Sequence, residues 1–129
     1  MIEVGAAIIE NTAGEILIAR RRSGKSQAGL WEFPGGKLEE NESVESCIER
    51  ELREEMNIEV RAGAWYGANE FDYGAVQIRL IAHKALYISG AIQLVDHDEF
   101  RWVRREELGA FHFAPADVPF VERLQKESA

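Results

Sequence analysis

This chain of 129 residues has no long apolar run and a single cysteine, and both features narrow the classes of protein to which it can belong. No apolar stretch approaches the roughly 20 residues that span a bilayer, and the N-terminal Met1-Ile2-Glu3-Val4 lacks the basic region of a signal peptide. We therefore expect a protein without a membrane partner, in a reducing cytoplasm. The only cysteine, Cys47, cannot form an internal disulfide, and its apolar helix position indicates a small core residue rather than a reactive thiol.

Basic residues are fewer than acidic ones. The chain has 15 Lys and Arg residues and 23 Asp and Glu residues, which gives a net charge of −8. This balance argues against a nucleic acid polymer as a partner, because such binding relies on basic side chains that neutralise phosphates. A phosphorylated small molecule is not excluded, because a bound metal ion inverts the local field. The length suits one domain, residues 1–129, which we expect to be a monomer or a homodimer.

The spacing of apolar residues predicts strands and helices in alternation. The predicted strands cover residues 3–10, 15–21, 60–71, 75–88 and 100–103. A turn signal at residues 11–14 predicts that the first two strands form a hairpin. One helix should begin after the N-cap Ser43 and end near Met56-Asn57, and Pro115 can open a final helix. This order indicates a mixed sheet with helices packed on it.

Three glutamates, Glu51, Glu54 and Glu55, are crowded on the predicted central helix. Glu51 and Glu55 are four residues apart, and like charges at this spacing destabilise a helix by roughly 0.2–0.5 kcal/mol. A hard divalent cation held by carboxylate oxygens would supply the missing countercharge, and Mg²⁺ with substrate phosphates is a common arrangement. A solvated acidic helix face is the alternative, and it explains Glu45 and Glu49 well.

The segment from Gly36 to Ile58 carries a spaced pattern around these glutamates. Gly36 is followed after five residues by Glu42, then after seven more by Arg50-Glu51-Leu52, and the segment ends in Glu54-Glu55-Met56-Asn57-Ile58. This pattern closely resembles the Nudix box of the Nudix hydrolases. The one departure is Asn57, where the family usually has glycine, and asparagine is the next-best residue for a left-handed helix end.

The resemblance covers nearly the whole chain. The segment 31–37 looks like the approach to the box in MutT-like nucleoside triphosphate diphosphatases, and Asp96-His97 before Trp102 resembles an acidic-His pair of that subfamily. The segment 114–119 resembles the start of its base-recognition helix. The resemblance implies an α/β Nudix fold, an α/β/α sandwich around a mixed β-sheet.

The resemblance also implies a metal centre for cleaving diphosphates. The metal, Mg²⁺ with Mn²⁺ as an alternative, would be bound by the Gly36 carbonyl and by Glu51, Glu54 and Glu55. Glu51 or Glu54 would also take a proton from the attacking water, and Arg50 would orient Glu51 through an ion pair. Asp96 stands where related enzymes often have a glutamate that binds metal or acts as a base, although its side chain is one methylene shorter.

Substrate contacts are expected from residues outside the box. Arg21 aligns with an arginine that contacts phosphate or sugar in the subfamily, Lys37 is a second candidate for phosphate, and Phe33 is a candidate for stacking on the base. Asp117 corresponds to a base-reading position, where an ionised carboxylate can accept from a cytosine amino group. The alternative is that Asp117 only caps the last helix.

We therefore expect a Mg²⁺-dependent nucleoside triphosphate diphosphatase that converts NTP and water to NMP and pyrophosphate. Its substrates would be cytosine or modified nucleotides such as CTP, dCTP, 5-methyl-dCTP or 8-oxo-dGTP. One alternative is a Nudix hydrolase of ADP-ribose or dinucleoside polyphosphates. Another is a catalytically silent Nudix domain that binds a nucleotide or a partner protein.

Overall fold

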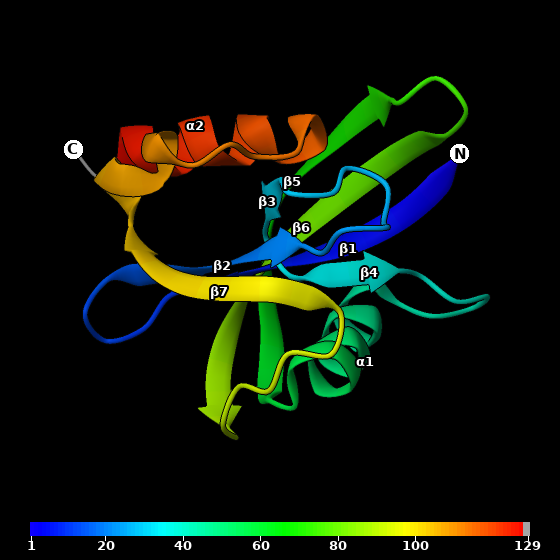
Figure 1. Ribbon diagram of the computed structural model, residues 1–129. Coiled ribbons are helices and arrows are strands. Elements are labelled where there is room, and N and C mark those ends of the chain that lie inside the picture. Colours follow the sequence, from blue (N-terminus) through cyan, green and yellow to red (C-terminus); the bar gives the residue numbers. More distant parts are fainter. Residues whose placement is uncertain (128–129) are drawn as a thin grey trace.

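The strands form two sheets in the computed structural model, which describes residues 1–127 (Figure 1). The larger sheet is mixed and has the order β4-β1-β6-β5. Its strands are β1 (Ile2–Ile9), β4 (Gly35–Lys37), β5 (Glu59–Asp72) and β6 (Gln77–Ser89). Within this sheet β1 and β6 run parallel to each other, whereas β1 with β4 and β5 with β6 are antiparallel.

The smaller sheet is antiparallel and has the order β3-β2-β7. It is formed by β2 (Glu15–Arg21), β3 (Trp31–Glu32) and β7 (His97–Arg104). The predicted hairpin of the first two strands is wrong, because β1 and β2 belong to different sheets and share only the bridge between Glu10 and Ile16. The turn itself forms, with the Asn11 side chain accepting from the backbone N–H groups of Ala13 and Glu15. It passes the chain from one sheet to the other.

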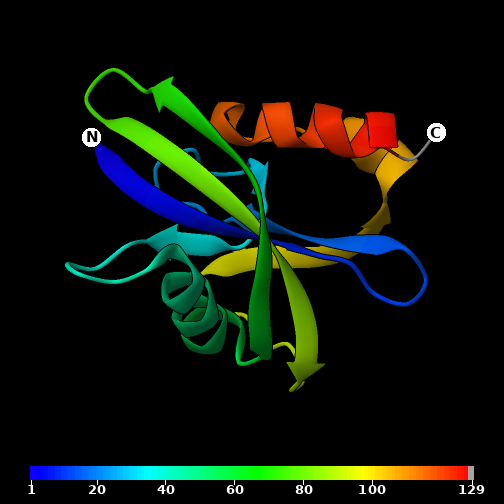
Figure 2. The ribbon, with the colours of Figure 1, turned by 180° about the vertical axis from the view of Figure 1, so that it is seen from behind.

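The two long helices cover opposite faces of the strands (Figure 2). Helix α1 (Val44–Met56) begins at the N-cap Ser43 and ends at Asn57 in the left-handed conformation, as predicted. Its apolar side packs on Ala7 and Ile9 of β1, whereas α2 (Val118–Glu127) packs on the opposite side with Ala6 and Ile8. Short 3₁₀ helices, η1 (Arg105–Ala110) and η2 (Pro115–Asp117), lead into α2.

This layering confirms the predicted α/β/α sandwich with a mixed sheet between helices. Alternating residues of β1 serve two cores, which explains why its sequence is apolar almost throughout. The short strands β3 and β4 have no clear period-two pattern and were not predicted. No helix within residues 1–127 is long and apolar enough to cross a membrane.

Candidate active site

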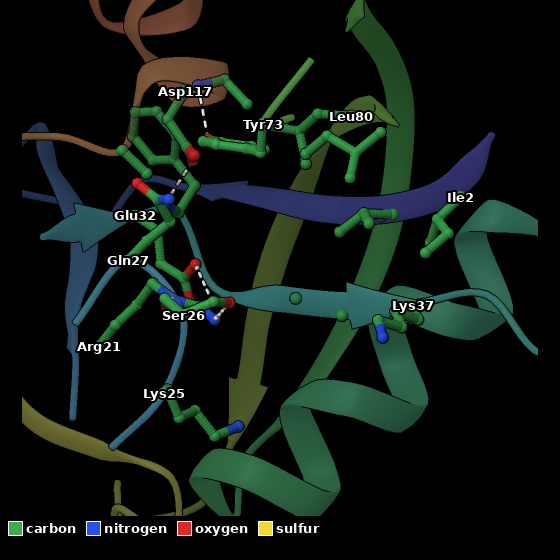
Figure 3. Close-up of a pocket in the computed structure, with 18 of the residues that line it drawn as sticks. Ile2, Arg21, Lys25, Ser26, Gln27, Glu32, Lys37, Tyr73, Leu80 and Asp117 are labelled. Carbon is green, nitrogen blue, oxygen red and sulfur yellow. Dashed lines mark hydrogen bonds and ion pairs between the residues drawn. The ribbon is translucent and has the colours of Figure 1, made fainter. Parts of the chain in front are cut away.

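A pocket of about 540 Å³ opens among β1, β4, the start of β6, η2 and the loop after β2 (Figure 3). Its volume is within the range of roughly 300–1,000 Å³ that is usual for small-molecule sites. Most of the residues predicted for the site line it, namely Arg21, Phe33, Gly36, Lys37, Glu51, Glu55, Asp96 and Asp117. Arg50 and Glu54 are not among the lining residues. The fold therefore gathers side chains from segments that are far apart in the sequence.

Gly36 on β4 lies directly against the Glu51 carboxylate of α1. A Cβ atom added at Gly36 would lie 2.4 Å from the carboxyl carbon of Glu51, which is closer than any side chain permits. The Gly36 carbonyl accepts from the Cys47 thiol at 3.3 Å. Glycine at position 36 permits this contact, and a larger residue would displace the flexible end of the Glu51 side chain.

Arg50 donates hydrogen bonds to three glutamates at once. Its Nε and Nη2 donate to the two carboxylate oxygens of Glu42, at 2.7 and 2.9 Å, and this bidentate pair lowers the pKa of Glu42 to about 2. Its Nη1 donates to Glu51 and to Glu54, each at 2.9 Å. The ion pair between Arg50 and Glu51 is the one predicted from the sequence. Glu42 holds the guanidinium of Arg50 and so supports the site through Arg50.

Of the three glutamates predicted to bind metal, Glu55 is the one that forms no ion pair within residues 1–127. Burial, followed by the nearby Glu51 carboxylate, raises the pKa of Glu55 from 4.5 to about 7. A partly buried carboxylate beside a second carboxylate is an electrostatic setting that a bound cation relieves. The donors at this point are oxygens, which suit a hard divalent cation.

Glu54 lies apart from that pair. Its side chain is 56% exposed, against 13% for Glu51, and it faces Arg50. Within residues 1–127, no group of three or more His, Cys, Asp or Glu side chains is arranged to hold a metal ion. The structure thus brings Gly36, Glu51 and Glu55 together, and the complete ligand set with Glu54 stays a prediction.

Asp96 lies in the pocket wall between β6 and β7 and is paired with two cations. Its carboxylate accepts from Arg22 Nε at 3.0 Å and from Lys25 Nζ. Both partners belong to the loop after β2, so Asp96 connects two loops that border the pocket. The roles of base or metal ligand for Asp96 stay predictions.

Asp117 is 5% exposed and its carboxylate accepts from the backbone N–H of Phe33 at 3.0 Å. Burial, followed by the nearby Glu32 carboxylate, raises the pKa of Asp117 well above its ordinary value. This bond joins Asp117 to the segment between β3 and β4 and not to the start of α2, so it is not the helix cap that the sequence left open. A neighbouring hydroxyl, that of Tyr73, accepts from the Ala116 N–H at 3.0 Å.

The family of the chain follows from its sequence as well as from this geometry. A model of the NUDIX domain matches residues 1–124. The chain belongs to the Nudix family. The box predicted from Gly36 to Ile58 is thus the Nudix box, and its glycine, arginine and glutamates are the residues that meet beside the pocket.

Relatives of this Nudix chain extend over nearly its full length. It is 42% identical over 122 residues to a CTP pyrophosphohydrolase of Escherichia coli, covering 95% of this chain and 90% of the relative. It is 32% identical to an 8-oxo-dGTP diphosphatase of Haemophilus influenzae, covering 99% and 94%. The crystal structure of a MutT protein from Methanosarcina mazei superposes with a TM-score of 0.87 at 31% identity, covering 98% and 94%.

Glu32 lines the pocket of this Nudix domain and is a site residue that the sequence prediction missed. Its carboxylate accepts from Arg21 Nη1 at 2.9 Å and lies 2.9 Å from His97 Nε2. Arg21 also donates to the backbone carbonyl and hydroxyl of Ser26, so much of its guanidinium is bound within the protein (Figure 3). An acidic residue between the buried Trp31 and Phe33 was the available signal, because a half-buried carboxylate needs partners.

Proposed function

We propose that this Nudix domain hydrolyses nucleoside triphosphates to nucleoside monophosphate and pyrophosphate, with a preference for cytosine nucleotides. One observation carries the proposal: the acidic pair Glu51 and Glu55 and the buried Asp117 line one pocket. A nucleoside triphosphate would place its phosphates, with a bound cation, at Glu51 and Glu55 and its base at Asp117. The 42% identical relative named as a CTP pyrophosphohydrolase supports cytosine as the base.

Mg²⁺, with Mn²⁺ as an alternative, would be held by Glu51, Glu54, Glu55 and the Gly36 carbonyl. When bound, it supplies neutralisation of the phosphate oxygens and a lowered pKa for an attacking water. The side chains of the protein position the reacting groups and move a proton. Glu51 or Glu54 takes the proton of the water as its oxygen attacks phosphorus, and Arg50 holds both carboxylates in place.

The water attacks one of the two phosphorus atoms that flank the α–β bridging oxygen. The bond from that phosphorus to the bridging oxygen breaks, and nucleoside monophosphate and pyrophosphate separate, one of them carrying the oxygen of the water. Lys25 and Lys37 line the pocket and bring positive charge to the phosphate chain. Arg21 would contribute through the guanidinium N–H groups that Glu32 and Ser26 do not bind. Asp96 remains a candidate base beside Lys25.

At the other end of the pocket, Asp117 would read the base. Its bond to the Phe33 N–H fixes the carboxylate, and an oxygen acceptor in this position favours a base that presents an amino donor. Phe33 lines the same pocket and would stack on the base.

Oxidised guanine nucleotides are the second candidate. The 32% identical relative named as an 8-oxo-dGTP diphosphatase favours them. The raised pKa of Asp117 supports this reading as well, because a protonated carboxyl can donate to a base as well as accept.

A panel of substrates tests the proposal. CTP, dCTP, 5-methyl-dCTP, 8-oxo-dGTP, ADP-ribose and a dinucleoside polyphosphate would be assayed with Mg²⁺ for pyrophosphate and phosphate release. We expect the highest kcat/KM with a cytosine nucleoside triphosphate. A higher value with ADP-ribose or with the dinucleotide would contradict the proposal, and no turnover of any substrate would favour a silent binding domain.

A further inference from the structure

Asn57 occupies the position at which this Nudix box departs from glycine. Its backbone is left-handed, with φ 60° and ψ 31°, and its N–H already closes the helix end by bonding the carbonyls of Arg53 and Leu52. Glycine would meet that conformational need with less strain. The asparagine side chain is thus not needed to close the helix end, and its amide makes a separate contribution.

That contribution is a bond to another segment. Asn57 Nδ2 donates to the backbone carbonyl of Ala91 at 3.3 Å. Ala91 belongs to a stretch between β6 and β7, residues 90–96, which we call the strap. The bond thus joins the end of the catalytic helix to a segment 34 residues away in the sequence.

The strap lies along the last turn of α1 through main-chain bonds. Gln93 N–H donates to the Met56 carbonyl at 3.0 Å, and Val95 N–H donates to the Glu55 carbonyl at 3.1 Å. These carbonyls have no partner within the helix, so the strap satisfies them. The start of the strap is also close-fitting, since a Cβ at Gly90 would lie 2.7 Å from the Asn57 carbonyl oxygen.

The strap ends at Asp96, in the pocket wall. One residue before it, Val95 is bonded to the backbone of Glu55, a predicted metal ligand. Asp96 in turn binds Arg22 and Lys25 of the pocket loop, residues 22–30, in which Lys25, Ser26 and Gln27 line the pocket. A continuous series of contacts thus runs from the end of α1, through the strap, to the loop that borders the substrate.

We propose that Asn57 is a positioning residue, whose bond to Ala91 holds the strap so that Asp96 keeps the pocket loop in place at the substrate pocket. The left-handed turn orients the side-chain amide toward Ala91. The hydrogen bond of the amide restricts the motion of the strap at Ala91, which is the end opposite to Asp96. A pocket wall that is already ordered binds substrate without the entropy cost of ordering it.

The test is Asn57→Gly, which is compatible with the left-handed turn and removes the side chain that bonds Ala91. Asn41→Gly is a matched control, because Asn41 is also left-handed, at φ 62°, and shows no side-chain hydrogen bond within residues 1–127. Both variants should fold, since glycine readily adopts this conformation. Each would be compared with the wild type by steady-state kinetics on dCTP with Mg²⁺ and by amide hydrogen exchange.

In Asn57→Gly we expect KM to rise by about threefold to tenfold, while kcat stays within about twofold, as the loss of one side-chain hydrogen bond predicts. Amide exchange should accelerate by a similar factor in residues 91–96 and in the pocket loop. Asn41→Gly should change neither. An unchanged KM and unchanged exchange in Asn57→Gly, or equal changes in both variants, would overturn the proposal.

The kinetic part of this inference rests on the proposed function, while the exchange measurement needs no substrate. If the wild type does not hydrolyse dCTP, the proposed function fails and exchange decides the role of Asn57 separately. If dCTP is hydrolysed but exchange in the strap is the same in wild type and Asn57→Gly, the positioning role fails and the proposed function stands.

Discussion

The Glu51 carboxylate lies so close to Gly36 that a Cβ atom at position 36 would come within 2.4 Å of its carboxyl carbon. This contact between β4 and α1 gives the glycine of the motif a steric reason in this chain. It places a strand carbonyl, a helix carboxylate and the open pocket beside one another. The two residues therefore act as a pair, and substitution of the small one should displace the charged one.

Gly36→Ala tests this steric relationship. The added methyl group would push the Glu51 carboxylate away from β4, so we expect kcat/KM on dCTP to fall by at least about tenfold, since small misplacements of catalytic groups lower rates strongly. Gly63→Ala is the matched control, because a Cβ there meets its nearest atom at an ordinary 3.4 Å. The explanation fails if the two alanine variants retain equal activity.

Glu55 predicts how stability depends on pH in the metal-free protein. Its folded pKa of about 7 lies above the ordinary 4.5, so its contribution to folding is fully present below pH 4.5 and is lost as pH rises through about 7. Glu55→Gln stays neutral and should not undergo this loss.

We therefore expect the free energy of unfolding of Glu55→Gln, relative to wild type, to increase from pH about 5 to pH about 8 in EDTA. Urea denaturation at several pH values measures it. Mg²⁺ should offset the loss in the wild type above pH about 7, because a bound cation favours the ionised carboxylate. A difference between the two proteins that is constant across this range would contradict the assignment.

Asp117→Asn tests the reading of the base. The amide oxygen can still accept from the Phe33 N–H, so the fold should be retained. The amide also donates, so activity on dCTP should fall relative to 8-oxo-dGTP, by about tenfold in the ratio of kcat/KM values. The ratio is measured with both substrates in the same buffer, and an unchanged ratio removes Asp117 from base recognition.

Much of the fold could be predicted from local pattern. The Ser43 cap, the apolar spacing of α1 and the left-handed Asn57 are set by neighbouring residues, and the structure confirms them. The strands that pair with β1 and with β2 could not be inferred in this way. Strand β1 pairs with β6 and strand β2 with β7, and both partners lie far along the chain. The turn signal at Asn11 was correct, but a turn does not determine whether two strands share a sheet.

The site shows the same division. The motif predicted the ion pair of Arg50 with Glu51, which lies within one helix. The bond of Asp117 to Phe33 crosses 84 residues, and Glu32 acquires its role from Arg21 and His97 on other strands. Such contacts depend on how the sheets meet, which no spacing within the sequence expresses.

The most direct test of the central claim is to identify and count the products formed from dCTP. Wild type with Mg²⁺ should yield dCMP and pyrophosphate in equal amounts. EDTA and Glu54→Gln should each lower turnover at least about a hundredfold, as expected for loss of a metal ion or a general base. Glu45→Gln, an exposed change on the same helix, should behave like wild type. Release of dCDP and phosphate, or turnover in EDTA and in Glu54→Gln comparable to that of the wild type with Mg²⁺, would contradict the account.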